Sequence, residues 1–331
     1  MSQASATDEM NATTSLSRFI KSNIREYGML LSLILIMVFF QVATGGILFR
    51  PVNLTNLILQ NSYIVIMALG MLLVIVAGHI DLSVGSVVGF IGAVAAVLMV
   101  QFHVHFFVTA ILCLVLAGAI GAGQGYFIAY LKIPSFIVTL AGMLVFKGLA
   151  LYILHGQSVG PFPKEFQLLS SGFLPSFAPD GFNTVSLLIG IIVTALVIYF
   201  NFRDRQNQSK HGTAEEPTLF FIGRNILVAA GFVLFSYLLA SYKGLPNVLI
   251  VMFALIVLYA FVTSSTTIGR RIYALGGNEK AARLSGIRTE RLTFLTFTNK
   301  GVLAGLAGLI FAARLNTATP KAGLGFELDV I

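Results

Sequence analysis

Asp81 is the acidic residue whose surroundings in the sequence are most unusual. It lies in the segment Gly78–Ser86, between two apolar stretches that are separated by almost no loop. An ionisable group at that depth is costly in hydrocarbon and by default marks a functional site. The nearby glycines and the Ser83 hydroxyl indicate an interrupted helix, whose freed backbone groups must be buried in protein or line a cavity. Three roles for Asp81 stay open: capping of the next helix, a part in a transport pathway or its gate, and proton coupling.

Two lysines, Lys147 and Lys300, also fall within apolar stretches. Lys147 either extends its ammonium group to the membrane interface or pairs with Asp81. Asn61 stands at the head of another apolar stretch, where an amide lines a pathway or bonds between helices. The candidate pathway residues are therefore Asn61, His79, Asp81, Ser83 and Lys147.

A basic segment, 269–287, predicts a short capped helix. Asn278 is a good N-cap, Glu279 suits the positive end of a helix, and Gly286 suits the position after its last turn. The helix expected over 278–285 is too short to be stable alone. Its own protein or a partner must therefore hold it in place.

Two signatures of catalysis are absent from the sequence. The chain contains no Gly-Lys dipeptide, which a phosphate-binding P-loop requires, and no His-Glu-x-x-His. Cys113 is the single cysteine and lies inside an apolar stretch, so it can form neither an intramolecular disulfide nor a cysteine metal site. We expect it to be packed inside a helix bundle. The sequence predicts neither catalysis nor a bound metal.

The composition determines which elements position these residues. The chain has 331 residues, of which 57% are hydrophobic and 10% charged, whereas soluble domains carry about 25% charged residues. The apolar residues gather in runs of about 17 to 25, the length of a membrane-spanning helix. We therefore predict an all-α, polytopic membrane helix bundle, with spans at 28–44, 61–78, 83–101, 105–131, 133–155, 182–202, 219–240, 245–263 and 292–315.

Glycine pairs at helical spacing predict close packing between these spans. Small residues on one face let helix backbones approach each other in a membrane. The segment 51–60, opened by a proline, is expected to be an interfacial lead-in to the second span. The three G-x-x-x-G pairs are Gly85 with Gly89, Gly121 with Gly125, and Gly301 with Gly305.

The distribution of Lys and Arg predicts the orientation. With the N-terminus inside, 14 of these residues lie in inner segments and 5 in outer segments, which is the bias of cytoplasmic loops. We expect a cytoplasmic tail over 1–27 and a membrane domain over 28–331. This domain includes an outer loop over 156–181 and a cytoplasmic loop over 264–291. The outer loop is expected to fold back on the membrane surface or to meet an extracytoplasmic partner.

The segment Gly269–Ile287 resembles the coupling loop of ribose/xylose-type sugar ATP-binding-cassette (ABC) permeases, in the branched-chain amino acid/ribose permease family. Gly78-His79 before Ile80-Asp81, and the long outer loop, are most similar to the multiple-monosaccharide and xylose permeases. The likeness also covers Val52–Leu59, His79–Ser86, Ile133–Gly142, Gly305–Leu315 and Ala313–Ile331.

The resemblance implies a bundle of the vitamin-B12-permease-like importer type in a bacterial inner membrane. It implies a subunit that moves a monosaccharide, xylose or several aldoses, into the cytoplasm. Its partners would be an ABC ATPase subunit, which binds ATP and Mg, a periplasmic sugar-binding protein and a second copy of the permease. The chain itself would bind no cofactor and no nucleic acid. Relatives continue into further helices past a segment like Glu327–Ile331, so C-terminal helices are expected to be missing. A neutral residue would be expected where Lys300 stands.

The same resemblance implies that the short helix transmits the motion of the ATPase. Ala281 and Ala282 are small enough to seat it in a groove of that partner, and Arg283 offers a forked donor to a partner carboxylate. Two other functions stay open: a proton-coupled secondary transporter with Asp81 as the carrier, and a non-transporting membrane interaction protein. The expected coupling residues are Gly277, Asn278, Glu279, Ala281, Ala282, Arg283, Leu284 and Gly286.

Overall fold

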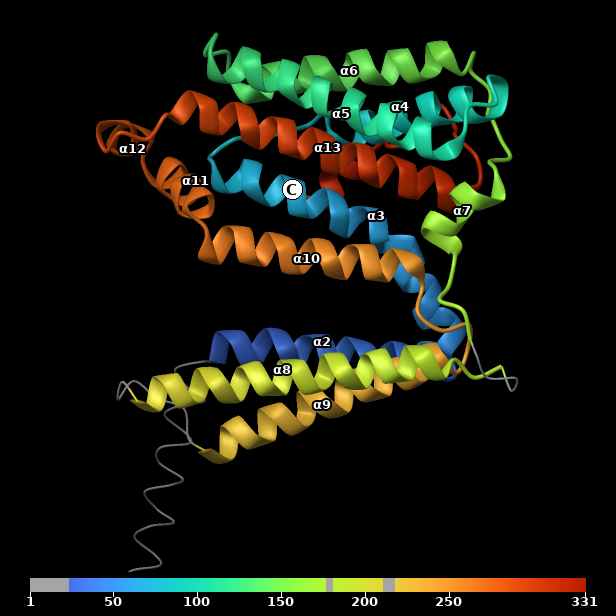
Figure 1. Ribbon diagram of the computed structural model, residues 1–331, viewed down its shortest axis with the longest axis vertical. Helices are drawn as coiled ribbons and strands as arrows, with labels where there is room; N and C mark the ends of the chain where they lie inside the picture. The colour runs from blue at the N-terminus through green and yellow to red at the C-terminus, as the bar shows by residue number, and fades with distance from the viewer. Residues whose placement is uncertain (1–23, 177–180, 211–217) are drawn as a thin grey trace, which may run out of the picture. The chain divides into compact units, whose positions relative to one another are not determined.

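The computed structural model describes residues 24–176, 181–210 and 218–331 (Figure 1). The chain divides into two compact units, Met1–Leu54 and Thr55–Ile331. Over the described ranges the regular elements are helices, together with two isolated β-bridges, which confirms the all-α class. Most of the predicted tail, 1–27, lies outside the described residues.

The elements follow in chain order. They are α2 (Ile24–Ala43), α3 (Pro51–Val76), α4 (Val84–Ala96), the π-turn η1 (Val97–Gln101), α5 (Phe106–Ala129), α6 (Ser135–Ile153), α7 (Lys164–Ser171), α8 (Thr184–Lys210), α9 (Thr218–Ala240), α10 (Asn247–Ser265), α11 (Thr267–Gly277), α12 (Glu279–Leu284), α13 (Thr289–Leu315) and the 3-10 turn η2 (Phe326–Asp329).

Eight of the described helices are long and apolar enough to cross a membrane, which confirms a polytopic bundle. They are α3, α4 with η1, α5, α6, α8, α9, α10 and α13. The predicted first span, 28–44, corresponds to α2, whose apolar part is the shorter stretch Leu31–Ala43.

The start of α3 differs from the prediction. The segment 51–60 is the first part of α3 rather than a separate interfacial lead-in. Pro51 is its first residue, a position where the missing backbone N–H costs nothing and the fixed φ suits a helix. The helix therefore runs for 26 residues from Pro51 to Val76.

The second unit is organised around α13, which packs along α5 and α4 (Figure 1). A Cβ atom on Gly121 would collide with the carbonyl oxygen of Phe297, and one on Gly301 would collide with that of Ala117. The two backbones are therefore close enough that only glycine fits, as the G-x-x-x-G spacing predicts. Gly85 and Gly89 in α4 instead pack against residues 322–327, which lead into η2.

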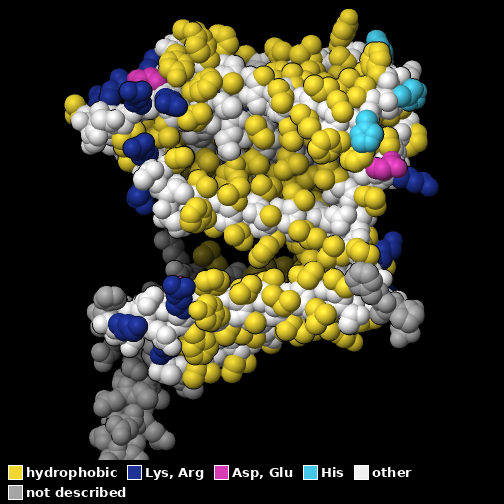
Figure 2. Space-filling view, viewed as in Figure 1, with side chains coloured by type: hydrophobic (Ala, Val, Ile, Leu, Met, Phe, Trp, Pro, Cys, Tyr) yellow, Lys and Arg dark blue, Asp and Glu magenta, His cyan; other side chains and the backbone are white. Residues whose placement is uncertain are grey.

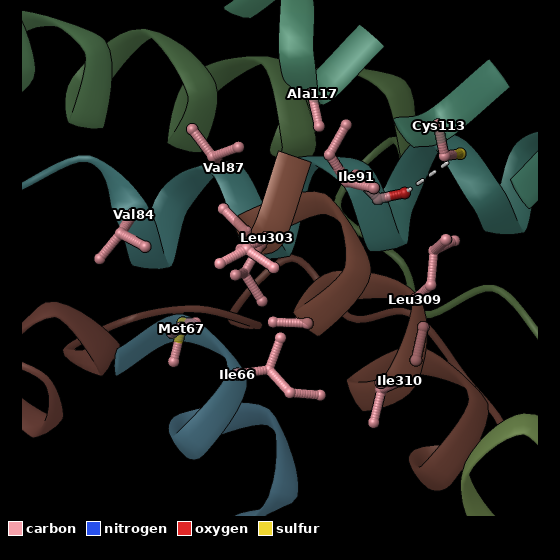
Figure 3. Packing of buried hydrophobic residues seen from close by; sticks show 14 of the residues in the cluster. Ile66, Met67, Val84, Val87, Ile91, Cys113, Ala117, Leu303, Leu309 and Ile310 are labelled. Atoms are coloured by element: carbon pink, nitrogen blue, oxygen red, sulfur yellow. Dashed lines mark hydrogen bonds between the residues drawn. The ribbon is translucent and has the colours of Figure 1, made fainter. Parts of the chain in front are cut away.

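Apolar side chains of α3, α4, α5 and α13 fill the space around this contact (Figure 3). Cys113 on α5 is fully buried and its Sγ lies 4.0 Å from the carbonyl oxygen of Ile91, so its predicted place inside the bundle is confirmed. The labelled core residues include Ile66, Met67, Val84, Val87, Ala117, Leu303, Leu309 and Ile310.

The described part of the predicted outer loop folds back onto the second unit. Val159 and Ala318 exchange two backbone hydrogen bonds, at 3.0 and 2.9 Å between N and O. Phe162 and Phe166, at the start of α7, are buried with their ring centroids 4.9 Å apart. Residues 177–180 of the loop lie outside the described residues. The loop is thus held to its own protein by backbone hydrogen bonds and by buried aromatic side chains.

Candidate functional site

Four polar side chains meet inside the second unit and form a buried cluster, Asp81, Ser83, Gln124 and Lys300. Asp81 and Ser83 lie in the turn before α4, Gln124 lies on α5 and Lys300 lies on α13. Their exposed fractions are 0%, 0%, 6% and 1%. The close glycine contact between α5 and α13 brings Gln124 and Lys300 to the same level beside that turn.

Lys300 and Asp81 form the ion pair at the centre of this cluster. Lys300 Nζ also donates to Gln124 Oε1 at 3.0 Å, and Gln124 Nε2 donates to Ser83 Oγ at 2.9 Å. Ser83 Oγ in turn donates to Asp81 Oδ1 at 2.7 Å. Burying two charges is costly, so such a pair persists only where further hydrogen bonds satisfy both partners. Each of the four side chains supplies or receives one of those bonds.

Asp81 caps the turn before α4 rather than α4 itself. The N-cap of α4 is Ser83, which makes no side-chain capping bond. Asp81 Oδ1 accepts a hydrogen bond from the Ser83 backbone N–H at 2.6 Å, so the carboxylate closes the turn before the helix. Its other oxygen faces Lys300. Asp81 therefore joins the start of α4 to the middle of α13.

His79 lies beside the buried cluster. Its ring centroid is 5.6 Å from that of Phe297, and its Nε2 lies 3.5 Å from the Thr293 hydroxyl oxygen. Burial lowers the pKa of His79 below its usual value and outweighs the opposing effect of the Glu279 carboxylate. The imidazole is therefore neutral at neutral pH.

Of the candidate pathway residues, His79, Asp81 and Ser83 lie together, whereas Asn61 and Lys147 lie elsewhere. Asn61 is exposed and its Nδ2 donates to the Leu57 carbonyl oxygen of its own helix at 2.8 Å. Lys147 is exposed on α6, and Asp81 pairs with Lys300 instead.

The sequence reasoning missed Gln124 and did not place Lys300 in the site. Both carried a usable signal. Lys300 is a cation inside an apolar stretch, and such a residue normally needs a partner. Gln124 is a polar residue between two glycines, Gly123 and Gly125, on a predicted span.

The predicted short helix is present as α12, in the connection between α11 and α13 (Figure 1). Asn278 is its N-cap, and its side-chain oxygen accepts a hydrogen bond from the Ala281 N–H at 3.0 Å. Gly286 follows its last turn with a φ of +81°, the left-handed conformation that favours glycine. The capping pattern was therefore interpreted correctly.

The side chains that α12 exposes differ from those expected to contact the ATPase. Ala282 is buried against its own chain with 4% exposure, so it is not available to seat α12 in a partner. Arg283 pairs with Glu290 and, at 3.5 Å, with Glu279, so its guanidinium group is already engaged. The most exposed apolar side chain of α12 is Leu284, at 90%.

Lys132 extends this exposed charge network to the turn between α5 and α6. Its Nζ lies 3.5 Å from a carboxylate oxygen of Glu290 and 3.8 Å from one of Glu279. Basic side chains gather at this end of the second unit (Figure 2). The network ties α12 to the first turn of α13 and to the end of α5.

One stretch has the G-x-S-x-G spacing of a hydrolase nucleophile. Ser158 is its central residue, within Gly156–Gly160. It lies in the connection after α6, whereas that motif acts at a sharp turn from a strand into a helix. In the described parts of the chain, no group of three or more His, Cys, Asp or Glu residues could hold a metal ion.

Comparison with known proteins identifies relatives over most of the chain. The profile of the family described as "Branched-chain amino acid transport system / permease component" matches residues 53–331. The xylose transport system permease protein of Haemophilus influenzae is 37% identical over 313 residues, which cover 93% of this chain and 80% of that protein. The Escherichia coli K12 xylose permease is 37% identical over 309 residues, covering 93% of this chain and 77% of that protein.

A ribose import permease protein of Escherichia coli K12 is 33% identical over 279 residues. These cover 84% of this chain and 67% of that protein. No solved structure matches the chain.

Proposed function

Because the chain belongs to the branched-chain amino acid transport system permease family, we propose that it is the membrane-spanning permease subunit of an ABC importer for a monosaccharide. The observation that carries this function is the similarity to xylose permeases over 93% of the chain. The ribose permeases are more distant, so xylose or a related aldose is the favoured substrate. A neutral sugar needs no charged site in the membrane, in keeping with the few ionisable residues in the spans.

The energy would come from a separate ATPase subunit that binds ATP and Mg. The chain has no P-loop of its own, and α12 offers an exposed Leu284 at the end of a two-turn helix. A periplasmic sugar-binding protein and a second permease copy complete the proposed importer. The chain itself would bind no cofactor.

The contacts within the chain give a route for the motion of α12. Arg283 of α12 bonds to Thr289 at 3.3 Å and pairs with Glu290, both in the first turn of α13. Lys300, three turns further along α13, pairs with Asp81 before α4. A displacement of α12 would therefore be passed along α13 to the start of α4.

The orientation is part of the proposal. The bias of basic residues, 14 to 5, favours a cytoplasmic N-terminus in a bacterial inner membrane. Cysteines placed at Ser209, at the end of α8, and at Leu168, on α7, test it because both side chains are exposed. We expect a membrane-impermeant thiol reagent to label Leu168→Cys from outside and Ser209→Cys from inside. Labelling of both from one side would refute the proposed topology.

Reconstitution in proteoliposomes tests the function itself. The purified chain is combined with the ATPase and the sugar-binding protein, and uptake of radiolabelled xylose is measured. We expect uptake that requires ATP and survives an uncoupler. Uptake that collapses with the uncoupler and persists without ATP would instead identify a proton-coupled transporter. Binding of the ATPase with no sugar uptake would identify a non-transporting interaction protein.

A further inference from the structure

A cavity of about 800 Å³ lies apart from the buried cluster, among α3, α10, α11 and α13. Its walls come from the ends of three candidate spans, the last turns of α3 and α10 and the first turns of α13. On α13 the lining runs from Arg291 to Asn299, and Arg288 lies just before the helix. Nine helical residues rise about 13 Å, a little under half of a hydrocarbon core of roughly 30 Å. A cavity that begins where these spans end would therefore reach into the bilayer.

The two parts of the cavity differ in chemistry. Arg271, Arg288 and Arg291 are exposed and line it where the spans end. The rest of the lining is mainly apolar, as at Leu258 and Leu295, and also includes the polar residues Tyr259, Thr296 and Asn299. The cavity thus combines a cationic mouth with a mainly apolar lining.

The three arginines lack carboxylate partners in the described chain. No Asp or Glu belongs to the described lining, and none of the three guanidinium groups forms an ion pair with a described residue. Glu290 is the nearest acidic neighbour of Arg288 and Arg291 in the sequence, and Glu279 is that of Arg271; both are engaged by Arg283 and Lys132. The N-terminal end of α13 opens on the same mouth and adds a positive partial charge.

We propose that this cavity binds the anionic headgroup and the upper acyl chain of a phospholipid from the adjoining leaflet. A phosphate at the mouth would be met by forked guanidinium donors, and the acyl chain would cover the apolar wall. Basic pockets between membrane helices are suited to anionic lipids. A neutral monosaccharide fits the mouth less well, because it neutralises none of the charges of the three arginines.

The test compares two triple variants of equal charge in the full-length chain. The pocket triple is Arg271→Gln, Arg288→Gln and Arg291→Gln. The control triple is Arg203→Gln, Arg270→Gln and Lys280→Gln, which are exposed cations outside the cavity lining. Each delipidated protein is titrated in detergent with phosphatidylglycerol or phosphatidylcholine, and bound lipids are counted by native mass spectrometry.

We expect the wild type and the control triple to retain one phosphatidylglycerol per chain and to bind phosphatidylcholine far more weakly. A basic residue near an anionic lipid surface contributes about fivefold in affinity, so the pocket triple should lose about a hundredfold. Leu295→Trp, which fills the apolar part and keeps every charge, should also weaken binding. Melting curves of each variant show whether a loss reflects unfolding.

Four results would overturn the proposal. They are equal binding of the two lipids, equal losses in the two triples, and displacement of the lipid by inorganic phosphate or xylose. The fourth is an unchanged lipid affinity in the pocket triple together with lost binding of the purified ATPase, which would make the arginines a protein-docking surface. None of these results depends on whether the chain transports a sugar, so the lipid site and the proposed function fail separately.

Discussion

The buried ion pair predicts a large and specific loss of stability when one partner is removed. Lys300→Met leaves the Asp81 carboxylate at 0% exposure with bonds only from Ser83. Breaking a buried pair in this way costs about 3–5 kcal/mol. Asp81→Asn should cost somewhat less, because Lys300 keeps its bond to Gln124 at 3.0 Å.

The double variant Asp81→Asn with Lys300→Met isolates the interaction between the two charges from their interactions with neighbouring groups. Both charges are then absent, and the asparagine oxygen still accepts from Ser83 in the turn before α4. Replacing a buried pair with neutral residues of similar volume is often neutral. We therefore expect the double variant to lie within about 1 kcal/mol of the wild type. The losses of the two single variants sum to at least about 5 kcal/mol, so the coupling free energy should be about 4 kcal/mol or more.

The assay is equilibrium unfolding in mixed micelles, followed by helical circular dichroism. Lys147→Met is the matched control, because Lys147 lies in a span and is exposed, so its loss should change the free energy of unfolding by less than about 0.5 kcal/mol. Additive effects of the two single variants would refute the coupling. A Lys300→Met protein as stable as the control would show that the pair does not form.

Three further predictions follow from individual contacts. Leu284→Glu should abolish co-purification of the ATPase without lowering the melting temperature, whereas Ala282→Glu should destabilise the permease itself, since these residues are 90% and 4% exposed. Gly301→Ala should cost about 1–3 kcal/mol through a clash with a carbonyl oxygen of α5, and Gly123→Ala, which has open space, should not. The pKa of His79 is lower in the folded than in the unfolded protein. Its contribution to the free energy of unfolding is therefore fully present above the unfolded pKa of about 6.5. That contribution is lost as the pH falls towards the folded pKa. Between pH 7.5 and pH 5, the melting temperature should therefore fall more steeply in the wild type than in the His79→Gln variant.

The helices could be predicted from the sequence, but their contacts could not. Runs of apolar residues predict the existence of each span, but the start of α3 at Pro51 was missed, because the segment 51–60 is too short and polar to cross a membrane alone. The spans are apolar on every side, so periodicity does not tell which face is buried. The partnership of Asp81 with Lys300 joins residues that are far apart in the chain. Nothing in their spacing separates Lys300 from Lys147, and only the packing of α13 against α4 does so.

In the short helix α12 too, the sequence predicted the local structure but not which side chains are buried. The cap by Asn278 and the turn at Gly286 are local, and local residue types predicted both. Ala282 and Leu284 are two residues apart on one helix, yet one is buried and the other is exposed. Their difference depends on how α12 lies against its own protein. A six-residue helix has no hydrophobic pattern long enough to predict that.

The two charge networks of α13 differ in strength, and this difference indicates where motion can occur. The network of Arg283, Glu279, Glu290 and Lys132 is largely exposed, and exposed pairs contribute about 0–1 kcal/mol each. The pair of Lys300 with its carboxylate is buried and hydrogen-bonded, and α5 packs against the same stretch of α13 without intervening side chains. A force on α12 therefore meets less resistance at the exposed network than at the buried one. The displacement reaches α4 only if α13 moves as a rigid body.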